Sequence, residues 1–200
     1  PAPSSAMPSG RYRLAFVAMP PFPPPPATVV MVSDGPGGGC TLVVGVDVSD
    51  GGAAWNVIRF RRGADARSIP PIRIPGEKVR NDRSALLAKL ADVLYGDYGG
   101  RRVSAMFLDS AFGAPYVERL QSMGHRNVIE VRFGGDSPDH HQANMRAHMW
   151  SRMKDWLATG AIDPKDQKLE IDLTGPGYHI NRQDKLVIES KEDMAKRGIA

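Results

Sequence analysis

The sequence has a single cysteine, Cys40, which leaves no partner for an internal disulfide, and no cysteine and histidine spacing matches a structural zinc site. No apolar run approaches the roughly 20 residues that a membrane-spanning helix requires. A phosphate-binding G-x-x-x-x-G-K-[ST] motif is also absent, because the glycine run at 37–39 is followed by Cys40 and not by lysine. We therefore expect a soluble protein of a reducing compartment, without membrane contact and without ATPase activity in this chain.

The composition is that of a globular domain and not of a disordered or fibrous chain. Hydrophobic residues make up 42% and charged residues 24% of the 200 positions, which is enough for one sizeable core. The 26 basic residues exceed the 22 acidic ones, and the net charge of +4 permits a polyanionic partner without requiring one. Charge alone therefore does not choose between function classes.

Proline is concentrated near the beginning of the chain. Ten of the 17 prolines lie in residues 1–39, which predicts an extended or polyproline-like arm or linker outside the catalytic part. Within this arm, the alternation in Arg11–Val17 is compatible with a strand added at a sheet edge. We therefore divide the chain into an N-terminal arm, 1–39, and one folded domain, 40–200.

Strand and helix patterns alternate through the folded domain. The predicted strands are Thr41–Val48, Ala54–Arg61, Ile69–Ile74, Val103–Leu108 and Asn127–Phe133. The predicted helices run from a cap at Asn81 or Asp82 to Gly96, over Pro115–Met123 and over His141–Thr159. A last pair of strands, Lys168–Leu173 and Lys185–Ser190, turns at residues 175–177, and a helix then starts at Glu192. This order predicts an α/β protein with a mixed five-stranded sheet, parallel first and fourth strands and a ribonuclease H-like fold.

Two aspartates fall at the ends of predicted strands. Asp47 shares a strand face with Val43 and Gly45, and Asp109 directly follows the fourth strand. Adjacent strands lie about 4.8 Å apart, so two such carboxylates can share one divalent cation or hold two about 3.5–4 Å apart. Oxygen ligands favour Mg²⁺ or Mn²⁺. The pattern predicts a carboxylate metal site, although each aspartate taken alone also fits a turn at a strand end.

Four stretches resemble the nuclease domain of the large terminase subunit of tailed phages. They occur over residues 40–200 in the family's order, as VVGVDVSDGG, VSAMFLDSAFGAPYVERLQSMGHRNVIEVRFGG, NMRAHMWSRMKDWLATGAI and LVIESKEDMAKRGI. The block around Asp109 and the IESKEDMAKRG tail are the most specific parts. In this family an ATP-driven motor translocates DNA, and the ribonuclease H-like nuclease cuts concatemeric viral DNA.

The resemblance implies a two-metal endonuclease that cleaves double-stranded viral DNA during genome packaging, with Mg²⁺ or Mn²⁺ as cofactor. The family's first two metal-binding acids match Asp47 and Asp109. As partners it implies the portal, the small terminase subunit and the ATPase motor domain. It also implies a location in the host cytoplasm, with transient residence at the procapsid portal.

The resemblance has one departure at the metal site. The family's third acid follows a segment like ESKEDMAKRG, in a Ser-Pro-Asp and Ala-Asp-Ala context, so we expect its counterpart beyond Ala200. Glu192 and Asp193 are the nearest acids but fall too early to match. They are typical acids of a first helical turn, and we do not assign the third role to them.

Histidines and basic residues supply further candidates. His140, His141 and His148 invite a metal interpretation, but solvated or core-lining histidines are the alternative without a carboxylate partner in register. Phosphate-binding candidates are Arg59, Arg61, Arg62, Arg101, Arg102, Arg146, Arg152, Lys185 and Lys191. Of these we favour Lys185 and Lys191 for DNA binding, because their hairpin is expected to overhang the acidic cleft.

The predicted reaction is hydrolysis of a DNA phosphodiester, with Asp47 anchoring the cations, Asp109 completing one site and a metal-activated water as nucleophile. Three alternatives stay open. One is a ribonuclease H-like nuclease of the Holliday-junction-resolving kind. Another is a catalytically silent module that docks on DNA or on the portal, and the third is an unrelated α/β scaffold with two structural aspartates.

Overall fold

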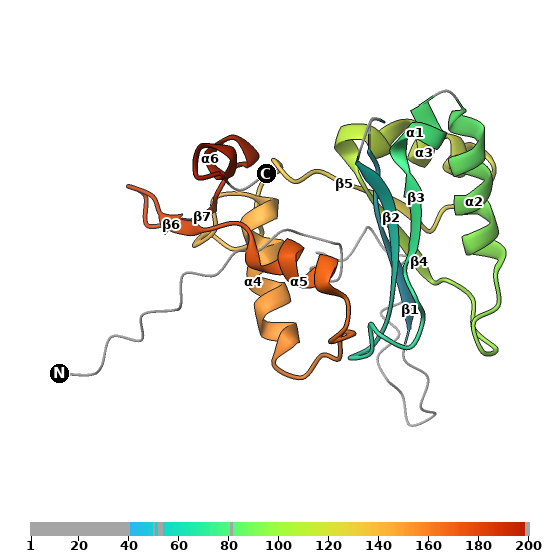
Figure 1. Ribbon diagram of the computed structural model, residues 1–200, viewed down its shortest axis with the longest axis horizontal. Helices are drawn as coiled ribbons and strands as arrows, with labels where there is room; N and C mark the ends of the chain where they lie inside the picture. Colours follow the sequence, from blue (N-terminus) through green and yellow to red (C-terminus); the bar gives the residue numbers. More distant parts are fainter. Residues whose placement is uncertain (1–40, 50, 52–53, 81, 199–200) are drawn as a thin grey trace.

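The computed structural model describes residues 41–49, 51, 54–80 and 82–198 (Figure 1). The predicted arm at 1–39, its strand in Arg11–Val17, and the residues Cys40 and Asn81 lie outside the described residues. The division of the chain at residue 40 therefore stays a prediction. No helix in the described part is both long enough and apolar enough to span a bilayer.

The centre of the fold is a five-stranded mixed sheet with the strand order β3-β2-β1-β4-β5. Its strands are β1 (Leu42–Asp47), β2 (Trp55–Arg62), β3 (Ile72–Pro75), β4 (Ala105–Asp109) and β5 (Val128–Val131). β1 and β2, and likewise β2 and β3, pair antiparallel, whereas β4 pairs parallel with both β1 and β5. The predicted mixed sheet with parallel first and fourth strands is confirmed.

One face of the sheet carries the main core. It is covered by α2 (Arg83–Tyr95) and α3 (Ser110–Ser122), with the short helix α1 (Gly76–Arg80) beside them (Figure 1). Val44, Val46 and Leu108 point to this face and are fully buried together with leucines of α2 and α3. The alternation of β1 and β4 therefore sends every second side chain, including the positions of both predicted acids, to the opposite face.

The opposite face is covered by the C-terminal half of the chain (Figure 1). Met149 of α4 (Met145–Leu157) packs against Phe107 and Val131 of the sheet. Further along α4, Met153 packs against α5 (Gln167–Thr174). A two-stranded hairpin of β6 (Tyr178–Ile180) and β7 (Leu186–Ile188) and the helix α6 (Lys191–Lys196) complete this layer.

The structure corrects the prediction for the C-terminal hairpin. Lys168–Leu173 is part of the helix α5 and not a strand, and β7 pairs with β6 instead. Leu169 and Leu173 are four residues apart and both buried, so they lie on one face of a helix. The Asp166 side chain caps this helix by accepting a hydrogen bond from the Leu169 amide at 3.1 Å.

Two helix starts also differ from the prediction. α3 begins at Ser110, so Pro115 lies inside the helix and does not start it. α4 begins at Met145 instead of His141, because the Asn144 side chain caps it through the Ala147 amide at 3.0 Å. In contrast, the predicted cap of α2 at Asp82 is confirmed.

A buried carboxylate, that of Asp166, fastens the C-terminal layer to the sheet. It accepts hydrogen bonds from Arg59 of β2 at 2.5 Å and from Arg73 of β3 at 2.8 Å. The side chains of Asp166 and Arg59 are only 8% and 6% exposed. Burial acts to raise the pKa of Asp166, but the hydrogen bonds and charge of the arginines outweigh burial and leave the pKa below its ordinary value.

We predict that Asp166→Asn lowers the free energy of unfolding by about 3 kcal/mol at neutral pH, because it leaves the buried Arg59 without its counter-charge. Urea unfolding measures this. The matched control is Asp163→Asn, whose exposed side chain accepts from the Lys165 amide at 2.9 Å, and which should stay within about 0.5 kcal/mol of the native chain. Equal losses in the two variants would contradict the role given to Asp166.

Candidate metal centre

The two predicted acids lie at corresponding ends of neighbouring parallel strands. The pairing of β1 with β4 runs from Val43 opposite Ala105 to Val46 opposite Leu108. Asp47 and Asp109 are the next residues in this register, and both are half-buried. Their backbones therefore start about one strand spacing, ~4.8 Å, apart at the same edge of the sheet.

Both aspartates lie on the face of the sheet that α4 covers. Val43 and Phe107 are on the same faces of their strands as Asp47 and Asp109, and both pack in the cluster that includes Met149. Two carboxylates on one face, at one edge, form an oxygen-donor pair. Such a pair fits a hard divalent cation such as Mg²⁺ or Mn²⁺.

The local structure around Asp109 gives this residue a structural task. Its side chain caps α3 by accepting a hydrogen bond from the Ala111 amide at 3.4 Å. The positive end of the helix dipole at this position favours the ionised carboxylate. A Cβ atom on Gly113 would lie 3.0 Å from Leu108, so glycine at this position lets α3 pack closely on the strand end. The interpretation of Asp109 as a turn-forming residue and its interpretation as a metal ligand are therefore compatible.

The chain that leaves Asp47 is fixed by a buried asparagine. Asn56, which is fully buried, accepts from the Ser49 amide at 3.0 Å and donates to the Ile74 carbonyl at 3.3 Å. One side chain thus joins the exit of β1 to β2 and β3. The sequence prediction missed Asn56, and the signal that could have found it is an uncharged polar residue among the apolar positions of a strand.

Several of the predicted phosphate-binding residues have structural partners. Arg59 is held in the buried pair with Asp166, and Arg152 pairs with Asp155 at 3.1 Å. Arg61 lies 5.9 Å from the centre of the Trp156 ring, and burial lowers the pKa of its guanidinium group. The charge of Arg59, one of the phosphate-binding candidates, is thus already used in a buried ion pair with Asp166.

The favoured lysines belong to the C-terminal hairpin region. Lys185 precedes β7 and is half-buried, and its backbone amide donates to Asn181 at 3.0 Å. Lys191 is the first residue of α6. The hairpin contacts α4 and lies on the side of α4 away from the sheet (Figure 1). One DNA duplex can therefore contact both these lysines and the two aspartates only if it extends past α4.

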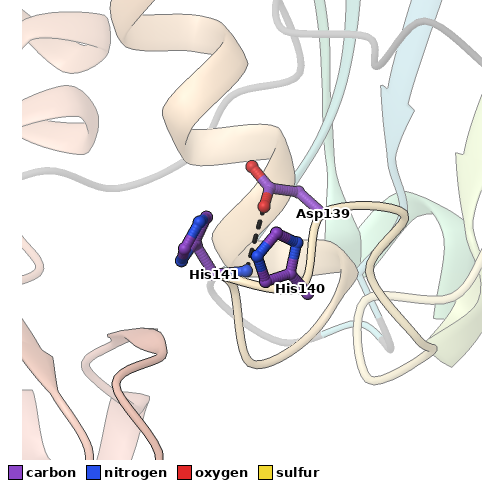
Figure 2. A group of neighbouring side chains, drawn as sticks. All are labelled: Asp139, His140 and His141. Carbon is purple, nitrogen blue, oxygen red and sulfur yellow. Dashed lines mark hydrogen bonds between the residues drawn. The ribbon is translucent and has the colours of Figure 1, made fainter.

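The histidines separate into a buried one and an exposed pair. His148 of α4 is only 5% exposed, and burial and then Arg152 lower its pKa, against an opposite effect of Asp139. His140 and His141 are exposed and lie in the turn before α4, next to Asp139 (Figure 2). The sequence prediction missed Asp139, although an aspartate directly before two histidines was a visible signal.

The acids near the end of the described chain behave as first-turn acids of α6. The Asp193 carboxylate accepts from Lys196 at 2.8 Å and from the Ser190 hydroxyl at 2.7 Å, the Asp193 amide donates to the Ser190 hydroxyl at 3.1 Å, and both α6 acids are exposed. Across the described residues, the only cluster of three metal-ligating side chains is Asp139, His140 and His141. In this part of the chain no third acid thus joins Asp47 and Asp109.

Comparison with known proteins gives a match in structure and none in sequence. No protein-family model and no curated protein matches the chain. The nuclease domain of the large terminase subunit gp2 of bacterial virus Sf6 matches with a TM-score of 0.53 at 14% identity, over 78% of this chain and 80% of that one. The fold is that of a terminase nuclease domain.

Two further structures agree. A variant of the Sf6 gp2 domain solved with calcium has a TM-score of 0.53 and 14% identity, over 80% of this chain and 83% of its own. The large terminase nuclease of thermophilic phage G20c has a TM-score of 0.50 and 15% identity, over 78% and 77%. The resemblance seen in the sequence is therefore confirmed at the level of the fold.

The cap formed by Asp109 predicts a difference between two substitutions. Asp109→Ala removes the acceptor for the Ala111 amide and should lower the free energy of unfolding by about 1 kcal/mol, whereas Asp109→Asn keeps a capping oxygen and should change it by a few tenths. Urea unfolding of both variants tests this. An equal loss in both would show that the charge of Asp109, and not its capping oxygen, stabilises the fold.

Proposed function

We propose that this chain is a divalent-metal-dependent endonuclease that cleaves double-stranded DNA during the packaging of a viral genome. The observation that carries the proposal is the register of β1 and β4, which puts Asp47 and Asp109 on one face at one edge of the sheet. The fold shared with terminase nuclease domains supports it. One of these similar domains was solved with calcium, a cation that prefers oxygen ligands.

Asp47 and Asp109 are the residues that would hold Mg²⁺ or Mn²⁺. A cation bound there supplies positive charge for the scissile phosphate and lowers the pKa of water. Asp109 is oriented by its hydrogen bond to the α3 N-terminus, and the chain leaving Asp47 is fixed through Asn56. The Asp109 carboxylate is thus oriented before binding, and the backbone that follows Asp47 is held in place.

The proposed substrate is the phosphate backbone of duplex DNA. The two acids would act on phosphate and not on base edges, so cleavage should show little sequence preference. We further propose the portal, the small terminase subunit and the ATPase motor as partners. The corresponding location is the host cytoplasm, with transient binding at the procapsid portal.

The test is cleavage of supercoiled plasmid in the presence of Mn²⁺ or Mg²⁺. We expect the native chain to nick the plasmid, and Asp47→Asn and Asp109→Asn each to lose at least about a hundredfold in rate. The asparagine at 109 keeps the helix cap, so unfolding does not explain the loss. A gel that separates nicked, linear and supercoiled forms measures the rates.

The matched control for this assay is Asp92→Asn. Asp92 is an exposed aspartate of α2, which covers the opposite face of the sheet, and its replacement should leave the rate unchanged. Equal nicking rates in the native chain and both site variants would contradict the proposed metal-binding role of Asp47 and Asp109.

The lack of a third acid beside Asp47 and Asp109 among the described residues favours one alternative, a module that binds DNA or the portal without cutting. That alternative predicts retention of duplex DNA by the native chain with no nicking at any metal concentration. A four-way junction offered beside plain duplex in the same assay separates a second alternative, because a junction-resolving nuclease would cleave the branched substrate first.

The proposed DNA contact of the hairpin region has its own test. We expect Lys185→Ala and Lys191→Ala each to weaken duplex binding and to reduce the slope of log affinity against log salt by about one. Fluorescence anisotropy at several salt concentrations measures this, with Lys89→Ala of α2 as control. If the slope is the same in all four chains, these lysines do not contact phosphate.

A further inference from the structure

A second cluster of metal-binding side chains lies away from the two aspartates. Asp139, His140 and His141 are consecutive in the turn between β5 and α4, and each offers one ligand atom. These three atoms all lie within 4.8 Å of one another. Figure 2 shows the Asp139 carboxylate beside the imidazole of His140, with His141 close by. The turn thus gathers one carboxylate and two imidazoles at a single point.

Backbone hydrogen bonds fix the shape of this turn. The Asp139 carboxylate accepts from the His141 amide at 2.9 Å, which is the dashed line in Figure 2, and from the Gln142 side chain at 3.3 Å. The Asp139 amide donates to the Ser137 hydroxyl at 3.0 Å. The rings of His140 and His141 lie with their centres 3.9 Å apart. Little reorganisation of the backbone is therefore needed to bring the three ligands together.

Buried polar atoms without partners lie next to the same turn. His148 is 5% exposed, and in the described structure neither of its ring nitrogens has a hydrogen-bond partner. Gln142 is 8% exposed, and its Oε1 atom likewise has none, although its Nε2 donates to Asp139. Buried polar groups in folded proteins normally have partners. Unpartnered buried polar atoms beside three metal-ligating side chains indicate a place where an ion or its bound water belongs.

We propose that Asp139, His140 and His141 bind one zinc-class divalent ion, with a remaining coordination position open to water and to the neighbouring Gln142 oxygen. Two imidazoles and one carboxylate form the donor set that Zn²⁺ takes in open sites. Imidazole nitrogen selects zinc, nickel or copper over magnesium and calcium. The site therefore differs in chemistry from the oxygen-only pair of Asp47 and Asp109, and it does not depend on nuclease activity.

The ion would stabilise the attachment of the C-terminal hairpin. The turn that carries the cluster is joined to β7, because the Leu186 amide donates to the His141 carbonyl at 2.7 Å and the Ala143 amide donates to the Leu186 carbonyl at 2.9 Å. A ligand that orders the turn also orders these two hydrogen bonds. Zinc should therefore protect the Leu186 and Ala143 amides from hydrogen exchange.

The experiment uses the full 200-residue chain, freed of metal with a chelator and dialysed against Zn²⁺ alone. Zinc bound per chain is counted in the native protein and in the double variant Asp47→Asn with Asp109→Asn, which removes competing sites. We expect one zinc per chain in the double variant and at least one in the native protein. In the double-variant background, adding His140→Ala or His141→Ala should weaken binding more than about tenfold, whereas His179→Ala, an exposed histidine of β6, should not.

Bound Co²⁺ provides a second readout, because its visible absorption reports direct coordination by imidazole. The absorption should appear in the double variant and disappear on His140→Ala. Both histidines are exposed, so circular dichroism should show unchanged folding in their alanine variants. Absence of zinc from the double variant, or equal zinc binding after replacement of either histidine of the cluster, would overturn the site.

Discussion

The parallel pairing of β1 with β4 is the constraint on which the candidate centre depends. Sixty-two positions separate Asp47 from Asp109, and the same offset relates every residue pair from Val43 and Ala105 onward. A slip of one residue would turn one carboxylate into the main core and move Leu108 to the face that α4 covers. The fully buried Val46 and Leu108 on the other face therefore help to fix the register and, with it, the positions of the acids.

Structural and chemical roles coincide in this centre. Asp109 ends a strand and caps a helix, and Asn56 joins three strands just beyond Asp47. The sheet edge is thus rigid before any ligand arrives, which is the condition for a precise metal site. The turn at Asp139 follows the same rule in a loop, since its backbone hydrogen bonds hold the imidazoles close. The two proposed sites, an oxygen-donor pair and an imidazole cluster, would thus differ in their metal preference within one domain.

The sequence predicted what depends on local pattern and failed where distant partners decide. The strand predicted over Thr41–Val48 follows from a nearly continuous run of apolar, β-branched residues, and the helix after Asp82 follows from its cap. Both are observed, as β1 and α2. The segment Lys168–Leu173 was misassigned because its apolar residues are too few to separate a period of two from one of 3.6. Arg59 stood among the candidates for phosphate contact because its partner, Asp166, lies 107 positions away. No local pattern reveals such a pair.

Asp166 also makes the packing of α5 against the central sheet sensitive to acid. Burial raises the pKa of this carboxyl, and the two arginines more than reverse the effect, so its folded-state pKa lies below the unfolded value. Its stabilisation is complete above the unfolded pKa and disappears as the pH falls through the folded one. A protonated Asp166 would leave two guanidinium groups side by side with no anion between them. Acidification should therefore loosen α5 from the sheet while the apolar core under α2 and α3 is still intact.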